Sequence, residues 1–446
     1  MKVEAAAGSR ARHPRHQLVD TSRFAPGLNE TEALYGLPPD VQFCRSCVIS
    51  NQRPSSSIEF KHAKGEKKST IRFDAHGVCD ACHFAQKKAG IDWSSRDQEM
   101  RALCDRYRRN DGRYDCIAPG SGGKDSFYAA WLLKHKYGMH PLTITWAPHI
   151  YTDWGWHNQQ SWIRAGYDNI LHSPNARVHR LLTRLAVENL LHPFQPFILG
   201  QKNLAPKVAL LHDVQLVFYG ENEAEYGNPV RENEQASRDA RYFSAEGRSE
   251  FLLGGVPLAQ LEADYGLEPV DYAWYLPADT NALRECGVQI HYIGYYERWH
   301  PQAAYYHAVQ HSDFRASPER TVGTYSKYNS IDDKLDDLHY YTTFIKFGIG
   351  RATYDAAQET RNQDITRDEA VALVRRFDGE YPERFLDELL RYLSLPVEEF
   401  PVASKMFEQP VLDRAYFDHL CDRFRSPHIW KYENGKWTLR HTASQP

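Results

Sequence analysis

The glycine-rich stretch Ser121–Ser126 (SGGKDS) combines residue types that can bind phosphate, and it stands between an apolar run and a helix-like run. Adjacent glycines permit a tight turn whose backbone N–H groups face one anion, and the N-terminus of the following helix adds partial positive charge. Ser121 and Ser126 add hydroxyl donors, and Lys124 adds a mobile cation. The stretch therefore predicts a pyrophosphate or polyphosphate site, with an ordinary strand-to-helix turn as the alternative.

The same stretch departs from two common phosphate-binding patterns at Asp125. A Walker loop needs Ser or Thr after its Gly-Lys pair, whereas Asp125 follows Lys124, and Ala118 stands where the first glycine belongs. The dinucleotide fingerprint also fails, because Gly120-x-Gly122 is followed three positions on by Asp125. A carboxylate disfavours a bare phosphate but suits a magnesium-bound one. We therefore expect Lys124 and Asp125 to be catalytic, with Asp125 on the magnesium.

Two C-x-x-C motifs form a second group with chemical potential. Cys44 and Cys47 are followed, after residues 48–78, by Cys79 and Cys82. Four thiolates with no open position suit a structural zinc ion. Redox-active dithiols, an iron–sulfur cluster and four unliganded thiols are the alternatives. The other cysteines are isolated in the sequence: Cys104, Cys116, Cys286 and Cys421.

An acidic segment, GENEAEYG at residues 220–227, directly follows an expected strand. Residues just past the C-terminal end of a parallel strand line the ligand crevice of the sheet. We expect Glu221, Asn222 and Glu225 to face the same opening as the glycine stretch. Glu221 and Glu225 are candidate general bases, and Asn222 is a candidate substrate ligand. The alternative is a solvated acidic loop.

Residues 323–355 mix carboxylates, cations and many tyrosines. Such a mixture is typical of a site for a polar ligand with ring faces and anionic groups, for example a nucleotide sugar. A salt-bridged helix surface is the simpler alternative, and Asp336 is a further carboxylate of the segment. The candidate substrate-binding residues here are Lys327, Asp332, Asp333, Lys334, Lys346 and Arg351.

The elements that must position these groups follow an α/β pattern. From Tyr114 onward, short apolar runs alternate with longer periodic runs, which is typical of βαβ units and a mostly parallel sheet. The last hundred residues predict helices, one of them opened by the capping box Thr366–Glu369. The expected strands span residues 115–119, 142–146, 168–172, 214–219 and 289–296, and expected helices follow Ser126 and span 175–191.

Composition limits the classes of partner. With 54 basic and 58 acidic residues among 446, the overall charge does not indicate nucleic acid or an anionic membrane. The first residues lack an apolar signal core, and no later run approaches a membrane-spanning length. We expect a cytoplasmic protein with no nucleic-acid partner and no membrane insertion.

The SGGKDS stretch resembles the PP-loop of the ATP pyrophosphatase superfamily, whose members cleave ATP between the α and β phosphates and adenylate a substrate oxygen. The resemblance implies a Rossmann-like sheet of that type and adenine near Trp146. The ATP-binding residues that it implies are Ser121, Gly122, Gly123, Lys124, Asp125, Ser126 and Trp146.

The ordered set CRSC, CDAC, SGGKDS, GENEAEYG, YSKYNSIDDK and HYYTTFIKFGIGRATYD is similar to the N-acetyl sugar amidotransferases of lipopolysaccharide and flagellar glycan biosynthesis. The likeness covers residues 41 to about 395. It implies that an acetamido group on a nucleotide-activated sugar becomes an acetamidino group, with release of AMP and pyrophosphate. The implied cofactors are ATP, Mg²⁺ and Zn²⁺.

Ammonia for this reaction needs a source. A built-in glutaminase needs a nucleophilic cysteine at the mature N-terminus or on a G-x-C-x-G elbow, and neither pattern is present. The resemblance implies a separate glutaminase with an ammonia-conducting, cyclase-like subunit. The alternatives are a PP-loop tRNA thiolase, which typically needs further active-site cysteines, and a non-catalytic zinc- and ATP-binding subunit of a glycan-synthesis complex.

We therefore expect five regions along the chain. The zinc module is too poor in apolar residues to fold on its own core, so we expect the metal to hold it together. The regions are a flexible N-terminal extension (1–40), a zinc-binding module (41–95), an ATP-binding α/β domain (96–230), its continuation with substrate-binding segments (231–345) and a helical C-terminal region (346–446).

Overall fold

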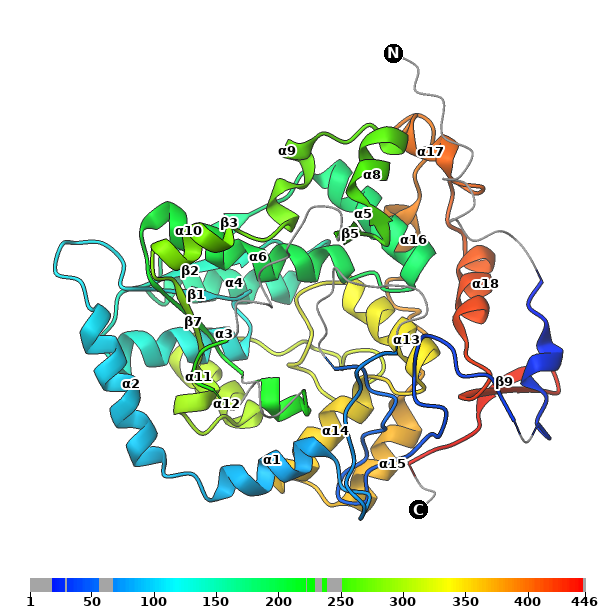
Figure 1. Ribbon diagram of the computed structural model, residues 1–446, viewed down its shortest axis with the longest axis horizontal. Helices are drawn as coiled ribbons and strands as arrows, with labels where there is room; N and C mark the ends of the chain where they lie inside the picture. The colour runs from blue at the N-terminus through cyan, green and yellow to red at the C-terminus, as the bar shows by residue number, and fades with distance from the viewer. Residues whose placement is uncertain are drawn as a thin grey trace.

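A five-stranded parallel sheet forms the centre of the molecule (Figure 1). The computed structural model describes residues 18–28, 30–55, 67–221, 223–228, 235–238 and 251–443. All neighbouring strands pair in parallel, in the order β3-β2-β1-β4-β7. The strands are β1 (Cys116–Pro119), β2 (Pro141–Trp146), β3 (Asn169–His172), β4 (Leu216–Tyr219) and β7 (Gln289–Tyr292).

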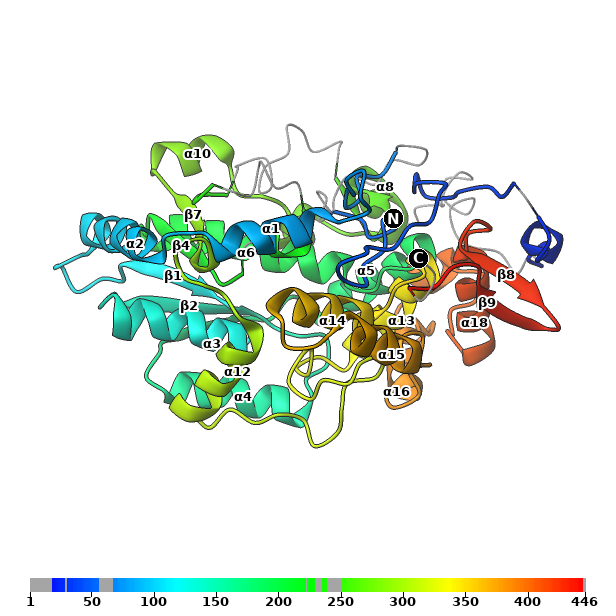
Figure 2. The same cartoon turned by 90° about the horizontal axis from the view of Figure 1, so that it is seen from below.

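Helices cover both faces of this sheet. On one face α6 (Gln195–His212) packs against β2, β1 and β4, whereas α3 (Lys124–Trp131) packs against β1 and β4 from the other face. Helix α12 (Pro301–His311) lies beside α3 (Figure 2). Neighbouring residues of β1 consequently enter opposite cores, Ile117 on the α6 side and Ala118 on the α3 side. Burial on both faces explains why the strands read as continuous apolar runs.

The strand order creates a crevice between β1 and β4. The chain runs from β1 to β2 and β3 on one side, and it returns to place β4 and β7 on the other side. Cys116 pairs with Leu216, and Ile117 pairs with Val217. Ligands of open α/β sheets bind where the strand order reverses in this way, beyond the carboxyl ends of the strands. The glycine stretch follows β1 and the acidic segment follows β4, so both lie at this point.

The N-terminal cysteine module packs against the C-terminal helices. Its helix α1 (Asp80–Ala89) contacts α14 (Arg351–Asn362), and Figure 1 shows both near α15 (Arg367–Phe377). Arg367 of α15 donates to the backbone carbonyls of Cys44 and Cys47. The cysteine module and the C-terminal helices, which are far apart in the sequence, therefore pack directly against each other.

The remaining elements surround this frame. The other α-helices among the described residues are α2 (Trp93–Tyr107), α4 (Asp153–Arg164), α5 (Ala176–Leu190), α8 (Leu258–Tyr265), α9 (Pro269–Tyr272), α10 (Thr280–Glu285), α11 (Ile293–Tyr296), α13 (Leu335–Phe347), α16 (Leu386–Leu393), α17 (Ala403–Met406) and α18 (Arg414–Phe424). Two short hairpins are β5 (Leu252–Leu253) with β6 (Val256–Pro257), and β8 (Trp430–Glu433) with β9 (Lys436–Leu439). A π-helical turn (Leu132–Lys136) extends α3.

The α/β class, the parallel sheet and the N-terminal cysteine cluster are confirmed. Two expectations need correction. The run expected as a strand over residues 289–296 divides at Tyr292, where β7 ends and α11 begins. The C-terminal region also contains the β8–β9 hairpin, which a purely helical expectation did not include. Among the described residues, no helix has both the length and the apolarity to cross a membrane.

Candidate active site

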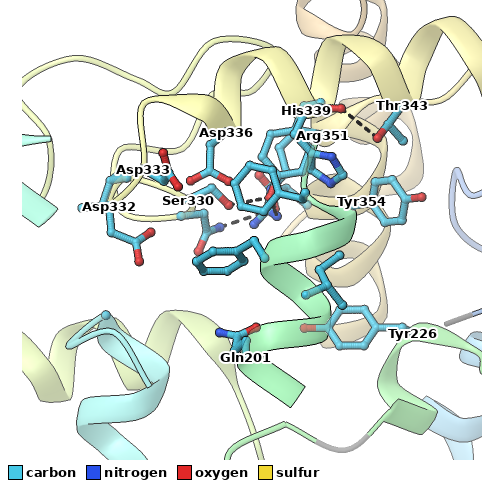
Figure 3. Close-up of a pocket in the computed structure, with 18 of the residues that line it drawn as sticks. Gln201, Tyr226, Ser330, Asp332, Asp333, Asp336, His339, Thr343, Arg351 and Tyr354 are labelled. Carbon is cyan, nitrogen blue, oxygen red and sulfur yellow. Dashed lines mark hydrogen bonds and ion pairs between the residues drawn. The ribbon is translucent and has the colours of Figure 1, made fainter. Parts of the chain in front are cut away.

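A cavity of about 610 Å³ opens beside the glycine stretch (Figure 3). One end is lined by Ser121, Lys124 and Asp125, together with Glu221 from the loop after β4. Much of the remaining lining comes from residues 328–358, which include α13 and the first part of α14. A cavity of this size, in which many charged and polar side chains converge beside aromatic rings, is suited to a polar small molecule.

Two glycines at the turn, Gly120 and Gly122, are required by the close approach of neighbouring atoms. Gly122 has a φ of +83°, and a Cβ built there would lie 2.6 Å from the Cα of Gln159 in α4. A Cβ on Gly120 would lie 2.0 Å from the Cβ of Ser126. Any side chain at either position would push the turn away from its neighbours. The turn is thus held tightly against α4 while α3 begins at Lys124.

Lys124 and Asp125 form an ion pair at the cavity. Lys124 Nζ lies 2.6 Å from Asp125 Oδ2, and the lysine side chain is almost wholly buried. Asp125 Oδ1 is buried and has no hydrogen-bond partner among the described residues. A buried carboxylate oxygen without a partner is costly unless a ligand meets it. Magnesium prefers such oxygens and commonly uses only one or two carboxylates beside substrate phosphates, so Asp125 fits the predicted role.

Glu221 lies beside this ion pair. Its carboxylate accepts hydrogen bonds from Trp299 Nε1, at 3.3 Å, and from the Tyr226 hydroxyl. Desolvation and the negative charge of Asp125 raise the pKa of Glu221 to about 8, although Lys124 opposes the shift. A carboxyl group with a pKa near neutrality can exchange protons during catalysis.

Glu225 does not line the cavity. Its carboxylate accepts a hydrogen bond of 2.5 Å from Lys88 Nζ of α1, and both side chains are buried. Lys88 also donates to the backbone carbonyl of Trp299 at 2.5 Å. The structure therefore separates the two candidate bases, with Glu221 at the cavity and Glu225 in a buried ion pair. Asn222 lies outside the described residues.

The other predicted ATP-binding residues differ in whether they line the cavity. Ser126 Oγ donates to the Gly123 carbonyl at 3.0 Å, which stabilises the turn. Trp146 is buried at the end of β2, with ring centroids 4.8 Å from His172 and 5.2 Å from Tyr275. Ser121 and Gly123 line the cavity, whereas Trp146 does not. An adenine site at Trp146 stays a prediction.

The predicted substrate-binding residues divide into two sets. Asp332, Asp333, Lys346 and Arg351 line the cavity. Lys327 is exposed and donates to the Pro318 carbonyl at 2.9 Å. Lys334 points to α16, where its Nζ lies 2.9 Å from a Glu388 carboxylate oxygen. Neither of these lysines is among the residues that line the cavity.

Several lining residues were absent from the sequence-based site. Arg53 comes from the cysteine module, and its guanidinium lies over the rings of Tyr226 and Tyr354. Asp336, near the start of α13, was noted as a carboxylate of its segment but not as a ligand, and its membership of that segment was the available signal. Nothing local marked Arg53. Further lining residues include Lys68, Phe194, Phe197, Tyr328, Tyr340 and Asp355.

The four cysteines come together as predicted. Cys44 Sγ lies 3.8 Å from Cys82 Sγ, and Cys47 Sγ lies 3.8 Å from Cys79 Sγ. All four sulfurs lie within 4.8 Å of one another and are buried. Zinc–sulfur bonds of about 2.3 Å in a tetrahedron require sulfur separations of about 3.8 Å. Backbone N–H groups of Ser46, Cys47 and Cys79 point at Cys44 Sγ, each at 3.4 Å, so the cluster fits zinc.

Comparison with known proteins adds a biological setting. Residues 322–443 match the family model described as "LPS biosynthesis protein WbpG-like, C-terminal domain". The match indicates involvement in lipopolysaccharide biosynthesis. It includes the cavity wall formed by α13 and the start of α14.

A second likeness is shorter. Seventy-seven residues are 30% identical to "Uncharacterized protein MJ1599" of Methanocaldococcus jannaschii. This region covers 17% of the present chain and 27% of the archaeal protein.

Proposed function

We propose that this chain is an ATP-dependent amidotransferase with a PP-loop, which converts the acetamido group of a nucleotide-activated sugar into an acetamidino group. One observation carries the proposal. The glycine turn, the unpartnered Asp125 oxygen and Glu221 line one cavity together with residues of the segment that matches the lipopolysaccharide biosynthesis family model. Surface polysaccharide or flagellin glycan biosynthesis is the proposed setting.

The first step activates the amide. The acetamido oxygen attacks the α-phosphorus of ATP, and the bond to the bridging oxygen of the β-phosphate breaks. Pyrophosphate leaves with that electron pair, and the amide nitrogen loses its proton to give a neutral O-adenylyl imidate. Lys124 and the glycine-turn N–H groups would meet the charge that develops on pyrophosphate. Magnesium, when bound, supplies positive charge to the phosphate oxygens, and Asp125 is the residue that would hold it.

The second step replaces oxygen by nitrogen. The lone pair of ammonia forms a bond to the imidate carbon while the C=N π pair moves onto the sugar nitrogen, and a proton leaves the attacking nitrogen. That pair then re-forms the C=N bond as the carbon–oxygen bond breaks, AMP departs with the electron pair of the broken bond, and the amidine takes up a proton to give the amidinium. Glu221 is the proposed proton acceptor, because it lies at the cavity while Glu225 is bound to Lys88. A separate glutaminase with an ammonia-conducting, cyclase-like subunit is the proposed source of ammonia.

The lining of the cavity favours this reaction over tRNA thiolation. Within the described residues, no cysteine lines the cavity. Sulfur transfer needs a thiol or persulfide carrier at the site, and this wall offers carboxylates and tyrosines instead. The non-catalytic alternative predicts ATP binding without substrate-dependent AMP formation.

A panel assay tests the proposal. The purified chain is supplied with ATP, Mg²⁺, ammonium and UDP- or CMP-linked acetamido sugars, and AMP release is followed by chromatography. We expect AMP formation that depends on one acetamido sugar, together with the mass change for replacement of O by NH. Tight ATP binding without turnover of any acetamido sugar would favour a non-catalytic subunit. Hydrolysis of glutamine by the chain alone at a useful rate would contradict the separate ammonia source.

A further inference from the structure

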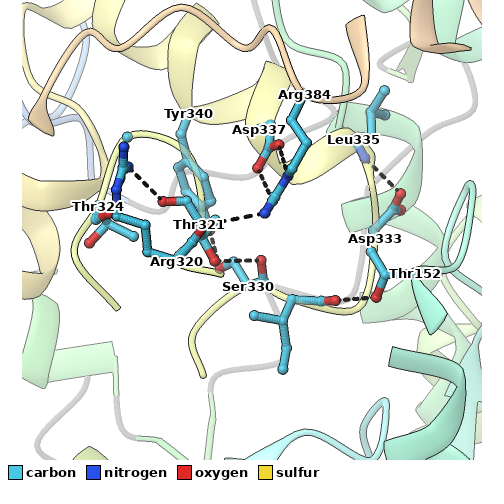
Figure 4. Close-up of polar contacts among 12 residues, drawn as sticks. Thr152, Arg320, Thr321, Thr324, Ser330, Asp333, Leu335, Asp337, Tyr340 and Arg384 are labelled. Carbon is cyan, nitrogen blue, oxygen red and sulfur yellow. Dashed lines mark hydrogen bonds and ion pairs between the residues drawn. The ribbon is translucent and has the colours of Figure 1, made fainter. Parts of the chain in front are cut away.

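Four carboxylates stand together at the start of α13, and two of them are satisfied by the protein. Asp333 Oδ2 lies 2.7 Å from both the backbone nitrogen and Nδ1 of His149, and Asp333 Oδ1 accepts from the backbone N–H of Leu335. Asp337 pairs with Arg384 through contacts of 3.0 and 3.1 Å (Figure 4). The contacts of these two carboxylates within the protein therefore give them structural roles.

The other two carboxylates, Asp332 and Asp336, line the cavity and have no cation partner within the described part of the chain. Ser121 of the glycine turn lies close enough to Asp332 to oppose the rise in its pKa. Asp336 is only 6% exposed, and its carboxylate has no hydrogen bond or ion pair with any described residue. Figure 3 shows both side chains at the same part of the cavity, near Ser330.

The nearest guanidinium is already engaged. Arg351 lowers the pKa of Asp336 through its charge, but its Nε lies 2.9 Å from Asp355 Oδ1 and it donates to the Tyr340 hydroxyl at 2.8 Å. Desolvation, together with the neighbouring Asp332 and Asp333, leaves the pKa of Asp336 well above its ordinary value. Burial also raises the pKa of Asp332. Within the described residues, neither carboxylate has a direct ion pair, and the charge of Arg351 does not offset the cost of burying Asp336.

The backbone holds the pair in place. The Thr152 N–H donates to the Asp332 carbonyl at 3.1 Å, and a Cβ on Gly155 would lie 2.5 Å from the Asp332 Cα. The neighbouring residue, Asp333, accepts hydrogen bonds from backbone N–H groups of the loop after β2. Asp332 therefore cannot leave the cavity without disturbing α4, and Asp336 is held in the first turn of α13. A fixed, buried pair of carboxylates is suited to a ligand that brings its own positive charge.

The proposed reaction has such ligands. Its nitrogen source binds as ammonium, which must pass one proton to the proposed base before its lone pair can attack, and its product is an amidinium cation. The phosphates of a nucleotide sugar would be repelled. An amidinium presents N–H groups in one plane, as a guanidinium does, and can donate to carboxylates on one side. The proximity of Ser121 places Asp332 beside the turn from which pyrophosphate would leave.

We propose that Asp332 and Asp336 form the site that binds ammonium before the reaction and cradles the amidinium group afterwards. This inference rests on the proposed amidotransferase function and adds the position of its nitrogen substrate. The pair acts on the second half-reaction and is not needed for adenylation.

Asp336→Asn tests the pair, with Asp337→Asn as the matched control one residue away. With ammonium chloride as the nitrogen source, we expect Asp336→Asn to raise the KM for ammonium roughly tenfold or more, as expected for loss of a charged hydrogen-bond partner. Sugar-dependent exchange of pyrophosphate into ATP should persist. Because a buried carboxylate is removed, the melting temperature should stay level or rise. Asp337→Asn should lower the melting temperature and leave the KM for ammonium unchanged.

A binding measurement separates this inference from the proposed function. Acetamidinium chloride should raise the melting temperature of the wild-type chain but not that of Asp336→Asn, because only a bound ligand stabilises the folded state. If no acetamido sugar supported exchange of pyrophosphate into ATP in the wild type, the proposed function would be overturned. The melting-temperature test of amidinium binding would still be valid. An unchanged KM for ammonium in Asp336→Asn, or a higher Mg²⁺ requirement with loss of exchange, would overturn the ammonium site.

Discussion

The four-cysteine cluster and the glycine-turn end of the cavity are both buried polar sites, but they are built in opposite ways. In the cluster, each sulfur has another sulfur within 3.8 Å, and Cys44 Sγ faces several backbone N–H groups. At the cavity, Asp125 Oδ1 has no partner among the described residues, and the Asp336 carboxylate has no ion pair there. The first arrangement is complete once one metal ion is present, whereas the second needs a ligand.

This difference assigns separate tasks to the two sites, yet the protein connects them. Lys88 of the cysteine module pairs with Glu225 and binds the Trp299 carbonyl, while Trp299 Nε1 donates to Glu221. Arg361 lies 3.9 Å from Cys47 Sγ and donates to the Glu225 carbonyl at 3.1 Å. The closed site therefore supports the loop that carries the open site. The following predictions test this division of roles, beginning with the largest effect.

Cys44→Ser should produce the largest loss. Removal of one zinc ligand leaves a module that has too small an apolar core to fold without metal, and binding energy of structural zinc is folding energy. We expect zinc content, measured by elemental analysis, to fall together with the yield of soluble folded chain. Cys286→Ser is the control, because Cys286 is exposed and outside the cluster. Normal folding of Cys44→Ser without zinc would contradict the structural role.

Lys88→Met tests the connection between the sites. Loss of the lysine would leave the Glu225 carboxylate buried without its partner, which typically costs about 3–5 kcal/mol. Chemical denaturation should show this loss, and the double variant Lys88→Met/Glu225→Leu should recover much of it. A Lys88→Met chain as stable as the wild type would show that the buried pair does not support the loop.

Lys124→Met should separate activity from stability. In the proposed reaction the lysine meets charge on the departing pyrophosphate, and loss of one such donor typically slows a reaction about 10²–10³-fold. We expect substrate-dependent AMP formation to fall by that factor while the circular dichroism spectrum stays unchanged. Lys327→Met is the control, because Lys327 donates only to the Pro318 carbonyl at the surface. Equal losses in both variants would contradict the role of the turn.

Glu221→Gln should change pH dependence. The pKa of Glu221 is raised from its ordinary 4.5 to about 8, so the folded chain favours the protonated form. Its contribution to stability is present below pH 4.5 and is lost as pH rises through about 8. The melting-temperature difference between wild type and Glu221→Gln should therefore change across this interval. As the proposed base, Glu221 should also give wild-type kcat/KM a rise toward pH 8 that the variant lacks, and identical pH profiles would contradict this.

Much of the frame could be predicted from the sequence because local patterns and tertiary burial agree. The strands β1, β2 and β4 are buried on both faces and read as apolar runs. The capping box of Thr366 and Glu369 forms as expected. The β8–β9 hairpin was also marked locally: Asn434 and Gly435 have φ values of +52° and +75°, as an Asn-Gly hairpin turn requires.

The site was less predictable because contacts distant in sequence decide which polar residue faces the cavity. Glu221 and Glu225 share one acidic segment, and only the pairing of Glu225 with Lys88, 137 residues away, separates their roles. Lys334 is withdrawn from the cavity by Glu388 of α16. Composition and spacing carry no information about such pairings.

The most direct measurement of the central claim follows the acetamido oxygen. A nucleotide sugar labelled with ¹⁸O in its acetamido carbonyl is incubated with the chain, ATP, Mg²⁺ and ammonium, and the products are analysed by mass spectrometry. Adenylation of the amide predicts that the ¹⁸O appears in the phosphate group of AMP and that the sugar carries nitrogen in its place. Unlabelled AMP, or formation of ADP instead of AMP, would contradict the account.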